Sequence, residues 1–498
     1  MKKINSVLAI LAAGALCAGF CACTGGPGFE NGFHPDYGVS PDYGDGNYDY
    51  ESVIENGFSD VSENPSSYFS LDRNTATYSL IRKQIERGLT VSPDSVRIEE
   101  MLNYFDYDFK APTEEAVAVS SYIAPCPWNE ENLLMLAGVK TAEYKVDSTV
   151  NNYVFLVDVS GSMDGAERIV LAKYGLTKLV DSLGENDVVS MVTYASGVKT
   201  VLDSKECTEN NKDRIKSAVN NLRAYGATNG GDGLQRAYAL ANKNFRQGGN
   251  NRVILISDGD FNVGMTSTSD LKEFIQTKAK SGVYLSVLGV GLGNMRDTNL
   301  ETLARCGNGN YAYLDNKTEA EKVLIHELNG TLTTVAKDAK AGVTFTENVE
   351  KYRLIGYDTK ILSEDDFNDD KTDAGEIGSN LCVSALYEIK VSDAAIENAK
   401  LADIEIKYKD VRGETELSKN ATCMVMLGAP SSDDLSFISC VAEFGLILRQ
   451  SKYKGEASID NVLTRLETLS EYISGDIYKQ EFKSLVYKAS ENEIYTKQ

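Results

Sequence analysis

Five oxygen-bearing side chains in this sequence could together hold a small, hard metal ion. The run Asp158-Val159-Ser160-Gly161-Ser162 directly follows the apolar stretch 152–157, and Asp258 follows a second apolar stretch, 253–256. Between them, Thr228 lies in a glycine-rich segment. Carboxylate and hydroxyl oxygens, completed by water, are the ligands that Mg²⁺ takes in octahedral geometry. The sequence therefore predicts an oxygen-lined site for a divalent metal at these strand ends.

A parallel sheet would bring these residues together. Short apolar runs typical of strands buried on both faces occur at 152–157, 188–194, 253–256, 284–290 and 311–314. Helical patterns lie between them, as in 166–183. Alternating strands and helices predict an α/β fold with a doubly wound, mainly parallel sheet, whose carboxyl edge binds ligands. The run 198–202 follows 188–194 so closely that it predicts a hairpin, and hence one antiparallel edge strand.

The same residues carry a resemblance to a known family. Asp158, Ser160 and Ser162 match the D-x-S-x-S motif of von Willebrand factor type A (VWA) domains, and Thr228 and Asp258 match the remaining positions of the metal-ion-dependent adhesion site (MIDAS). The resemblance implies a Rossmann-like VWA fold in which the three hydroxyls contact Mg²⁺, with Mn²⁺ or Ca²⁺ as alternatives. Asp158 and Asp258 would act directly or through water. A protein partner would complete the shell with an Asp or Glu.

The flanking sequences resemble modules of a bacterial VWA family that includes many lipoproteins. Residues 68–108, with Arg97-Ile98-Glu99-Glu100-Met101-Leu102, are similar to the module that precedes the VWA domain. Residues 352–357 and 366–376 resemble the module that follows it. The predicted division is a signal peptide over 1–23, a tether over 24–63, an N-terminal module over 64–148, the VWA domain over 149–336, a β-rich C-terminal module over 337–430 and a helical segment over 431–498.

Local periodicity predicts the elements of these flanks. A helical pattern begins at Ser67 and continues through Tyr78 and Ile85, and a second covers 95–104. Strands are expected at 117–123, 133–139, 342–345, 352–356, 383–391, 404–408 and 423–427, and amphipathic helix over 435–487. We expect the β-rich parts to pack together, with the VWA domain inserted between them. The acidic run 364–376 fails the EF-hand pattern and is interpreted as a solvated loop.

The first residues have the order of an export signal. Lys2 and Lys3 precede an apolar run, 7–20, that is too short to span a membrane. Phe20-Cys21-Ala22-Cys23 resembles a bacterial lipobox, which implies lipidation at Cys23, although Phe20 departs from the aliphatic residue of that pattern and leaves simple secretion open. Residues 24–63 are rich in Gly, Asp, Tyr, Ser and Pro, a composition typical of a flexible tether. The predicted location is the cell envelope, with the N-terminal lipid as membrane anchor.

Composition excludes several classes of function. With 73 Asp plus Glu against 50 Lys plus Arg, the net charge of −23 repels nucleic acid. Only two histidines and no C-x-x-C occur, which argues against a zinc site, and six cysteines beyond Cys23 are expected to be buried thiols. Gly289-Val290-Gly291-Leu292-Gly293 has the wrong spacing for a dinucleotide site, and no Walker lysine is present, so no nucleotide is expected.

Together these features predict a non-enzymatic protein that grips a partner carboxylate through its metal. Ser160 and Ser162 have no convincing base nearby in sequence, since His34 lies in the tether and His326 far along the chain. Two rival hypotheses stay open. One is an envelope scaffold or chaperone-like protein in which the metal is structural. The other is a metal-dependent hydrolase, although a hydroxyl-rich site activates water poorly compared with zinc.

Overall fold

The computed structural model describes residues 54–71, 73–144, 150–227, 231–259, 268–292, 297–327, 334–372, 374–396, 398–411, 417–428, 431–492 and 495. The predicted lipidation site Cys23, the tether up to residue 53 and Thr228 lie outside these residues. Within the described part of the chain, none of the helices combines the length and the apolar character needed to cross a membrane.

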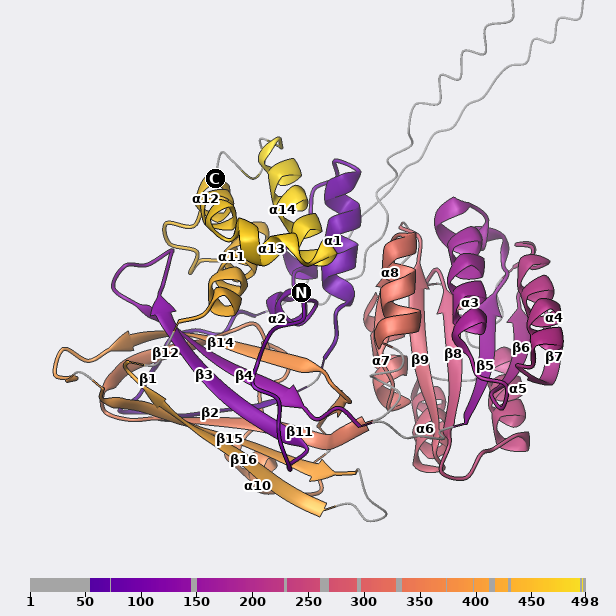
Figure 1. Cartoon of the computed structure of the whole chain (residues 1–498), viewed down its shortest axis with the longest axis horizontal. Coiled ribbons are helices and arrows are strands. Elements are labelled where there is room, and N and C mark those ends of the chain that lie inside the picture. Colours follow the sequence, from indigo (N-terminus) through magenta and orange to yellow (C-terminus); the bar gives the residue numbers. More distant parts are fainter. Residues whose placement is uncertain are drawn as a thin grey trace, which may run out of the picture. The chain divides into compact units, whose positions relative to one another are not determined.

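The domain predicted to be a VWA domain is built on a sheet of six strands, in the order β10-β9-β8-β5-β6-β7 (Figure 1). The strands are β5 (Asn151–Asp158), β6 (Val188–Tyr194), β7 (Val198–Glu206), β8 (Asn250–Ser257), β9 (Val283–Val290) and β10 (Tyr311–Leu314). All neighbours are parallel except β6 and β7, which are antiparallel. The predicted doubly wound sheet with one antiparallel edge strand is confirmed.

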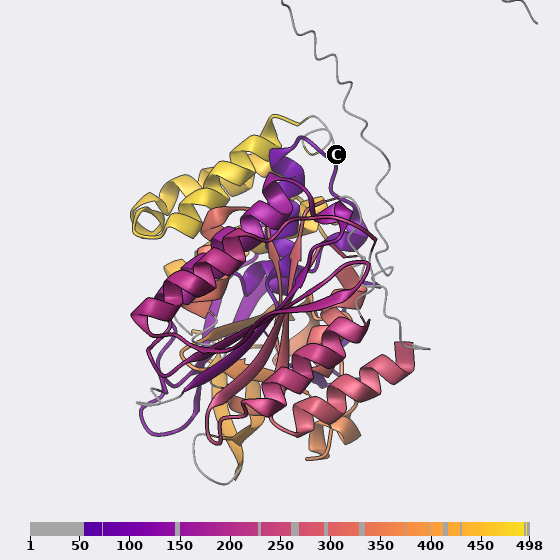
Figure 2. The same cartoon turned by 90° about the vertical axis from the view of Figure 1, so that its right-hand side faces the viewer.

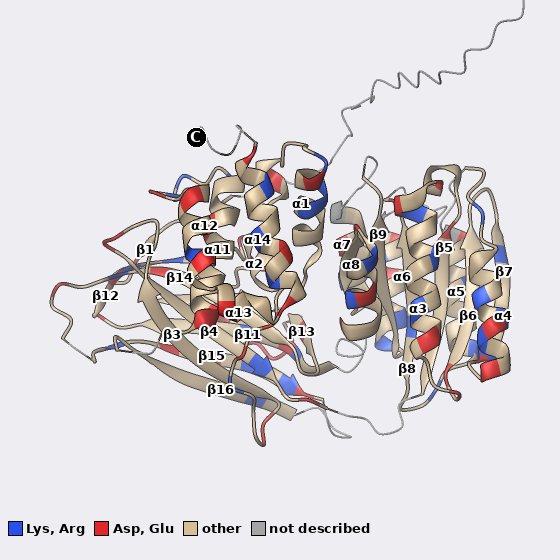
Figure 3. Ribbon diagram, turned by 45° about the horizontal axis from the view of Figure 1, so that its top comes forward, with Lys and Arg blue, Asp and Glu red and all other residues tan. Residues whose placement is uncertain are grey.

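Helices cover both faces of this sheet (Figure 2). One core lies under α3 (Leu171–Ser182), α4 (Glu209–Asn220), α8 (Lys317–Glu321) and the helical turn η4 (Lys322–Glu327). The other lies under α5 (Gly231–Lys243), α6 (Thr268–Lys280) and α7 (Asp297–Cys306). Strands β5 and β8 are buried almost along their whole lengths, because apolar side chains alternate between these two cores. Acidic and basic residues are mixed along α3, α4 and α8 (Figure 3).

The flanking sequences form a second body from chain segments on both sides of the VWA domain. One sheet has the order β1-β12-β14-β4-β3, and the other has the order β13-β11-β15-β16 with β2 paired to β11. The first contains β1 (Ser59–Asp60), β3 (Val117–Pro125), β4 (Leu133–Thr141), β12 (Val349–Ile355) and β14 (Cys382–Val391). The second contains β2 (Ser66–Ser70), β11 (Thr334–Phe345), β13 (Gly375–Gly378), β15 (Lys400–Asp410) and β16 (Leu417–Met426). Because β14 pairs with β4 and β11 with β2, the modules before and after the VWA domain share both sheets.

Two sequence-based assignments in this flanking body are wrong. Residues 54–63 were expected in the tether, but β1 pairs with β12, and the Asn56 side chain donates to the Gly356 carbonyl at 2.8 Å. The helical pattern was expected from Ser67, yet residues 66–70 form strand β2. This strand pairs with β11, and its Phe69 is fully buried between half-buried neighbours.

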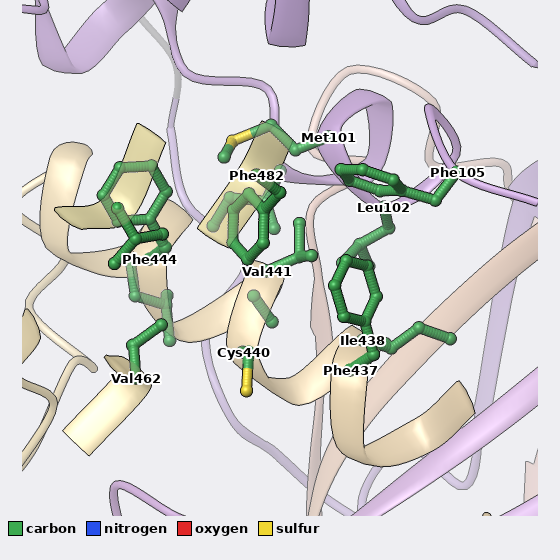
Figure 4. Packing of buried hydrophobic residues seen from close by; sticks show 14 of the residues in the cluster. Met101, Leu102, Phe105, Phe437, Ile438, Cys440, Val441, Phe444, Val462 and Phe482 are labelled. Carbon is green, nitrogen blue, oxygen red and sulfur yellow. The ribbon is translucent and has the colours of Figure 1, made fainter. Parts of the chain in front are cut away.

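A helical layer packs on the first of these sheets. It contains α1 (Ala76–Glu86), α2 (Ile98–Leu102), α11 (Asp433–Leu448), α12 (Ile459–Thr468), α13 (Ser470–Ser474) and α14 (Ile477–Ser490). Helix α11 is apolar all round and buried over nearly its whole length, which suits a central helix. Its Phe437, Val441 and Phe444 contact the same cluster as Met101 of α2 and Phe482 of α14 (Figure 4). The acidic run 364–376 is not simply a loop, since it contains the short helix α10 (Glu364–Asn368), capped by Ser363, and strand β13.

Helix α1 also joins the flanking body to the VWA domain through a buried charge cluster. Ala76 and Leu80 of this helix belong to the VWA core under α5 to α7. Its Arg82 guanidinium forms hydrogen bonds with Asp315 at 2.6 and 2.7 Å, Glu319 at 2.8 Å and Glu481 at 2.7 Å. The Tyr104 hydroxyl accepts from Arg82 at 2.9 Å and donates to Glu319 at 2.6 Å. The chain thus supplies both charge and hydrogen bonds for every member of this cluster.

Candidate metal centre

The first part of the candidate site is the turn that follows β5. Asp158 is the last residue of the strand and is fully buried. Its Oδ1 accepts a hydrogen bond from the Ser160 backbone N–H at 2.8 Å, which folds the turn back on the carboxylate. The Oγ atoms of Ser160 and Ser162 lie 3.0 Å apart. A carboxylate and two hydroxyls are therefore gathered within one turn, as the sequence predicts.

Strand β8 delivers the second carboxylate beside the first. It pairs in parallel with β5, with Ile256 opposite Val157, so Asp258 emerges at the same edge of the sheet as Asp158. Asp258 is 1% exposed. The preceding Ser257 donates from its hydroxyl to Oδ2 of Asp158 at 3.2 Å, which connects the two strand ends. Sequence reasoning did not single out Ser257, although its place before Asp258 at a strand end was a usable signal.

Thr228 itself is outside the described residues, but the segment leading to it is not. The Gly161 N–H donates to the Gly226 carbonyl at 2.9 Å, and the Tyr225 N–H donates to the Val159 carbonyl at 2.7 Å. Gly226 has a φ of +81° and a Cβ there would stand 2.6 Å from the Ser196 Oγ, so a side chain at this position would be both strained and crowded. The chain therefore approaches Thr228 along the turn that carries Ser160 and Ser162.

Burial makes the ionised form of Asp158 costly. It raises the pKa of the Asp158 carboxyl above its usual range, against the hydrogen bonds from Ser160, and the nearby Asp258 charge raises that pKa further. The Tyr194 hydroxyl, at the end of β6, lowers the pKa of the Asp158 carboxyl in turn. Burial and the Asp158 charge together raise the pKa of the Tyr194 phenol, which stays protonated as a donor. Tyr194 is a second residue that the sequence analysis missed.

This arrangement fits a hard divalent cation. Among the described residues, no three His, Cys, Asp or Glu side chains are grouped closely enough to hold a metal, so a metal here would depend on hydroxyl and water oxygens as well. Asp158 and Asp258 with Ser160 and Ser162 offer such a mixed set, which suits Mg²⁺ better than zinc. A dication would also offset the cost of two carboxylates buried side by side.

One positively charged side chain, Arg168, reaches the candidate site. The Nε of Arg168 lies 3.8 Å from Oδ2 of Asp258, and its Nη2 donates to the Leu292 carbonyl at 3.0 Å. Arg168 belongs to the turn η3 (Ala166–Val170), which precedes α3. Periodicity placed this turn in a helix but gave no indication that its arginine would face Asp258, because that contact depends on how β8 and β9 are placed.

The two histidines weighed in the sequence analysis add nothing to this centre. His326 is part of η4, and His34 lies outside the described residues. The six cysteines from Cys126 to Cys440, all described, form no disulfide. Four of them are buried and two, Cys306 and Cys423, are partly exposed.

Three family models match the chain. The model described as "von Willebrand factor type A domain" matches residues 152–329, which include both candidate carboxylates. The model described as "von Willebrand factor" matches residues 45–136, and the model described as "Uncharacterized protein YfbK, C-terminal" matches residues 330–491. The two outer matches cover the segments that share the flanking sheets.

The chain is also similar to individual proteins and solved structures. The chain is 36% identical over 436 residues to the uncharacterized protein YfbK of Escherichia coli (strain K12), with 82% of this chain and 75% of YfbK covered. It is 27% identical to the inter-alpha-trypsin inhibitor heavy chain H3 of Mesocricetus auratus, with 49% of this chain and 30% of that protein covered. A solved von Willebrand factor type A structure from Catenulispora acidiphila aligns with a TM-score of 0.40 at 14% identity, covering 74% of this chain and 89% of that one.

Proposed function

Because the chain belongs to the family of VWA-domain proteins that includes YfbK, we propose that it is a non-enzymatic binding protein that captures a protein partner through a metal ion. The ligands would be Asp158, Ser160, Ser162, Thr228 and Asp258, with Mg²⁺ as the metal and Mn²⁺ or Ca²⁺ as alternatives. The observation that carries the proposal is the pair of buried carboxylates at one sheet edge with two hydroxyls beside them.

The number of ligands explains why a partner could complete the site. Two carboxylates and three hydroxyls would fill five positions of an octahedral shell, and a partner carboxylate would displace an exchangeable water from the sixth. The chain's own residues hold and orient the metal and exclude water from the inner side, since Asp158 and Ser160 are buried. When bound, the metal supplies the positive charge that the partner's Asp or Glu recognises.

The decisive experiment is partner capture from envelope extract with and without chelator. We expect capture by the wild-type chain to be lost when Mg²⁺ is removed, and to be weakened in Thr228→Ala, which deletes a hydroxyl without changing the charge. A matched control is Thr200→Ala, on the edge strand β7, which should capture the partner as the wild type does. Equal capture by Thr228→Ala and by metal-free protein would favour the scaffold hypothesis with a structural metal.

The envelope location is a further part of this proposal. The order of charged, apolar and small residues before Cys23 supports export and lipidation at that cysteine. Cys23→Ser is expected to move the protein from the membrane fraction to the soluble fraction, as judged by fractionation and by mass spectrometry of the N-terminal peptide. A wild-type chain without lipid would leave secretion as the alternative. Turnover of an ester, peptide or glycan substrate would instead favour the hydrolase hypothesis.

A further inference from the structure

Arg168 stands between the candidate metal centre and the end of strand β9. Its Nε lies 3.8 Å from Oδ2 of Asp258, while its Nη2 is held by the Leu292 carbonyl at 3.0 Å. The Arg168 side chain is 28% exposed, whereas Asp258 is almost completely buried. The guanidinium therefore reaches from the molecular surface to a buried ligand of the proposed site, with its outer end fixed to the backbone.

The space for this guanidinium depends on a glycine. Gly291 has a φ of +75°, and a Cβ at this position would lie 2.3 Å from the Arg168 Nε. Among the described residues, the buried Nε–H finds no acceptor within hydrogen-bond distance. The contact with Asp258 is therefore an attraction between charges and not a completed hydrogen bond, so a competing cation could replace it without breaking a hydrogen bond at Nε.

We propose that Arg168 is a built-in competitor of the metal, which offsets the charge of Asp258 when no metal is bound and opposes the metal when it enters. This inference rests on the proposed function. A guanidinium and a dication that share one carboxylate repel each other, and water screens this repulsion poorly where the carboxylate is buried. The partial exposure of Arg168 gives its side chain a route toward solvent as the metal binds. The result would be a site that holds its metal weakly and gains affinity once a partner carboxylate adds negative charge.

The neighbouring Glu167 provides a matched control. Its carboxylate pairs with Lys83 of α1 at 2.7 Å and with Arg87, which caps the C-terminal end of α1. Glu167→Gln removes a charge from the same turn and breaks both pairs, but it leaves the attraction between Arg168 and Asp258 in place. The pair with Arg87 is exposed and the pair with Lys83 is partly buried, so the loss of stability should be modest and this variant should fold.

The test is calorimetric titration of Mg²⁺ into the chelator-treated full chain. We expect Arg168→Gln to lower the Kd for Mg²⁺ about tenfold, equivalent to about 1.4 kcal/mol, and to melt at a lower temperature than the wild type before metal is added. Glu167→Gln should bind Mg²⁺ with a Kd within about twofold of the wild-type value. The reason is that the Glu167 charge is paired with Lys83 and Arg87. Gly291→Ala is an independent route to the same result, because its methyl group would displace the guanidinium while keeping the arginine.

The outcomes separate this inference from the function on which it rests. If the wild type binds Mg²⁺ but Arg168→Gln and Gly291→Ala bind it equally or more weakly, Arg168 is a structural residue and the competitor role is overturned. If Glu167→Gln tightens binding as much as Arg168→Gln does, the effect belongs to the turn's general charge and the inference is also overturned. If neither Mg²⁺ nor Mn²⁺ binds the wild type, the metal centre and the inference fail together.

Discussion

Two buried charge clusters in this protein differ in how closely an arginine approaches the carboxylates. Around Arg82, the chain places Asp315, Glu319 and Glu481 within 2.6 to 2.8 Å of the guanidinium. At the candidate metal centre, Asp158 and Asp258 lie beside each other, and the Arg168 Nε lies 3.8 Å from Asp258, beyond hydrogen-bond range. Burial alone therefore does not mark a ligand site. The useful distinction is whether an arginine donates to the buried carboxylates at hydrogen-bond distance, as Arg82 does, or lies beyond it, as the Arg168 Nε does.

The largest effect is expected from removing the cation of the Arg82 cluster. Arg82→Met leaves Asp315 and Glu319 buried without their partner, and we expect a loss of about 3 to 5 kcal/mol in the free energy of unfolding. Urea denaturation measures it. Arg87→Met on the same helix is the control, because its side chain is 41% exposed and pairs with the exposed Glu167. Equal losses in the two variants would show that the buried cluster has no special role.

The metal centre should respond in the opposite direction. Asp158→Asn keeps the shape of the side chain and removes one of two adjacent charges, so the metal-free protein should be no less stable than the wild type. In the wild type, metal at about a hundred times its Kd should add roughly 2.7 kcal/mol, and Asp158→Asn should lose this gain. Melting curves with and without Mg²⁺ measure both effects. If Asp158→Asn strongly destabilises the metal-free protein, Asp158 stabilises the fold itself, as Arg82 does.

Glu376 offers an intermediate case, because it is half-buried and its hydrogen-bond donors are neutral. Asn308 donates to it at 3.1 Å and Thr334 at 3.3 Å, and burial raises the Glu376 pKa to about 7. A raised pKa in the folded state means that its stabilising contribution is complete below the unfolded pKa of about 4.3 and is lost as pH rises through about 7. Glu376→Gln should therefore gain about 2 kcal/mol relative to the wild type between pH 5.5 and pH 8. Denaturation at these two pH values tests it, and an unchanged difference would contradict it.

The smallest effect is expected where both partners face solvent. Asp203 pairs with Lys243 at 2.9 Å, and their side chains are 43% and 58% exposed. Asp203→Asn should change the free energy of unfolding by less than about 0.5 kcal/mol, because water screens the pair and both side chains lose conformational freedom when they pair. Urea denaturation at low salt measures this change in the free energy of unfolding. A loss approaching that of Arg82→Met would mean that distance, not burial, governs these pairs.

The sequence was sufficient for the VWA sheet because its signals are local. Each strand is a short, buried apolar run, and Asp158 and Asp258 follow two such runs directly, so their meeting at one edge follows from parallel pairing. The contact of Arg168 with Asp258 was not predictable in this way, since it depends on where the end of β9 lies in space. Residues 66–70 were assigned to a helix because periodicity alone does not settle a short segment, and the pairing of β2 with β11 does.

The pairing of β4 with β14 also determines the order in which parts of this chain can fold. Leu136 lies opposite Leu386, and Tyr68 opposite Gly342, so the flanking sheets need residues from both sides of the VWA domain. Strands β5 to β10, in contrast, follow one another along the chain without a strand of the flanking sheets between them. During synthesis the VWA domain therefore has all its strands while β4 still waits for its partner. Loop-closure entropy grows only slowly with length, so this insertion costs little at equilibrium. Its cost is kinetic, because an unpaired strand edge remains open to other chains until β14 emerges.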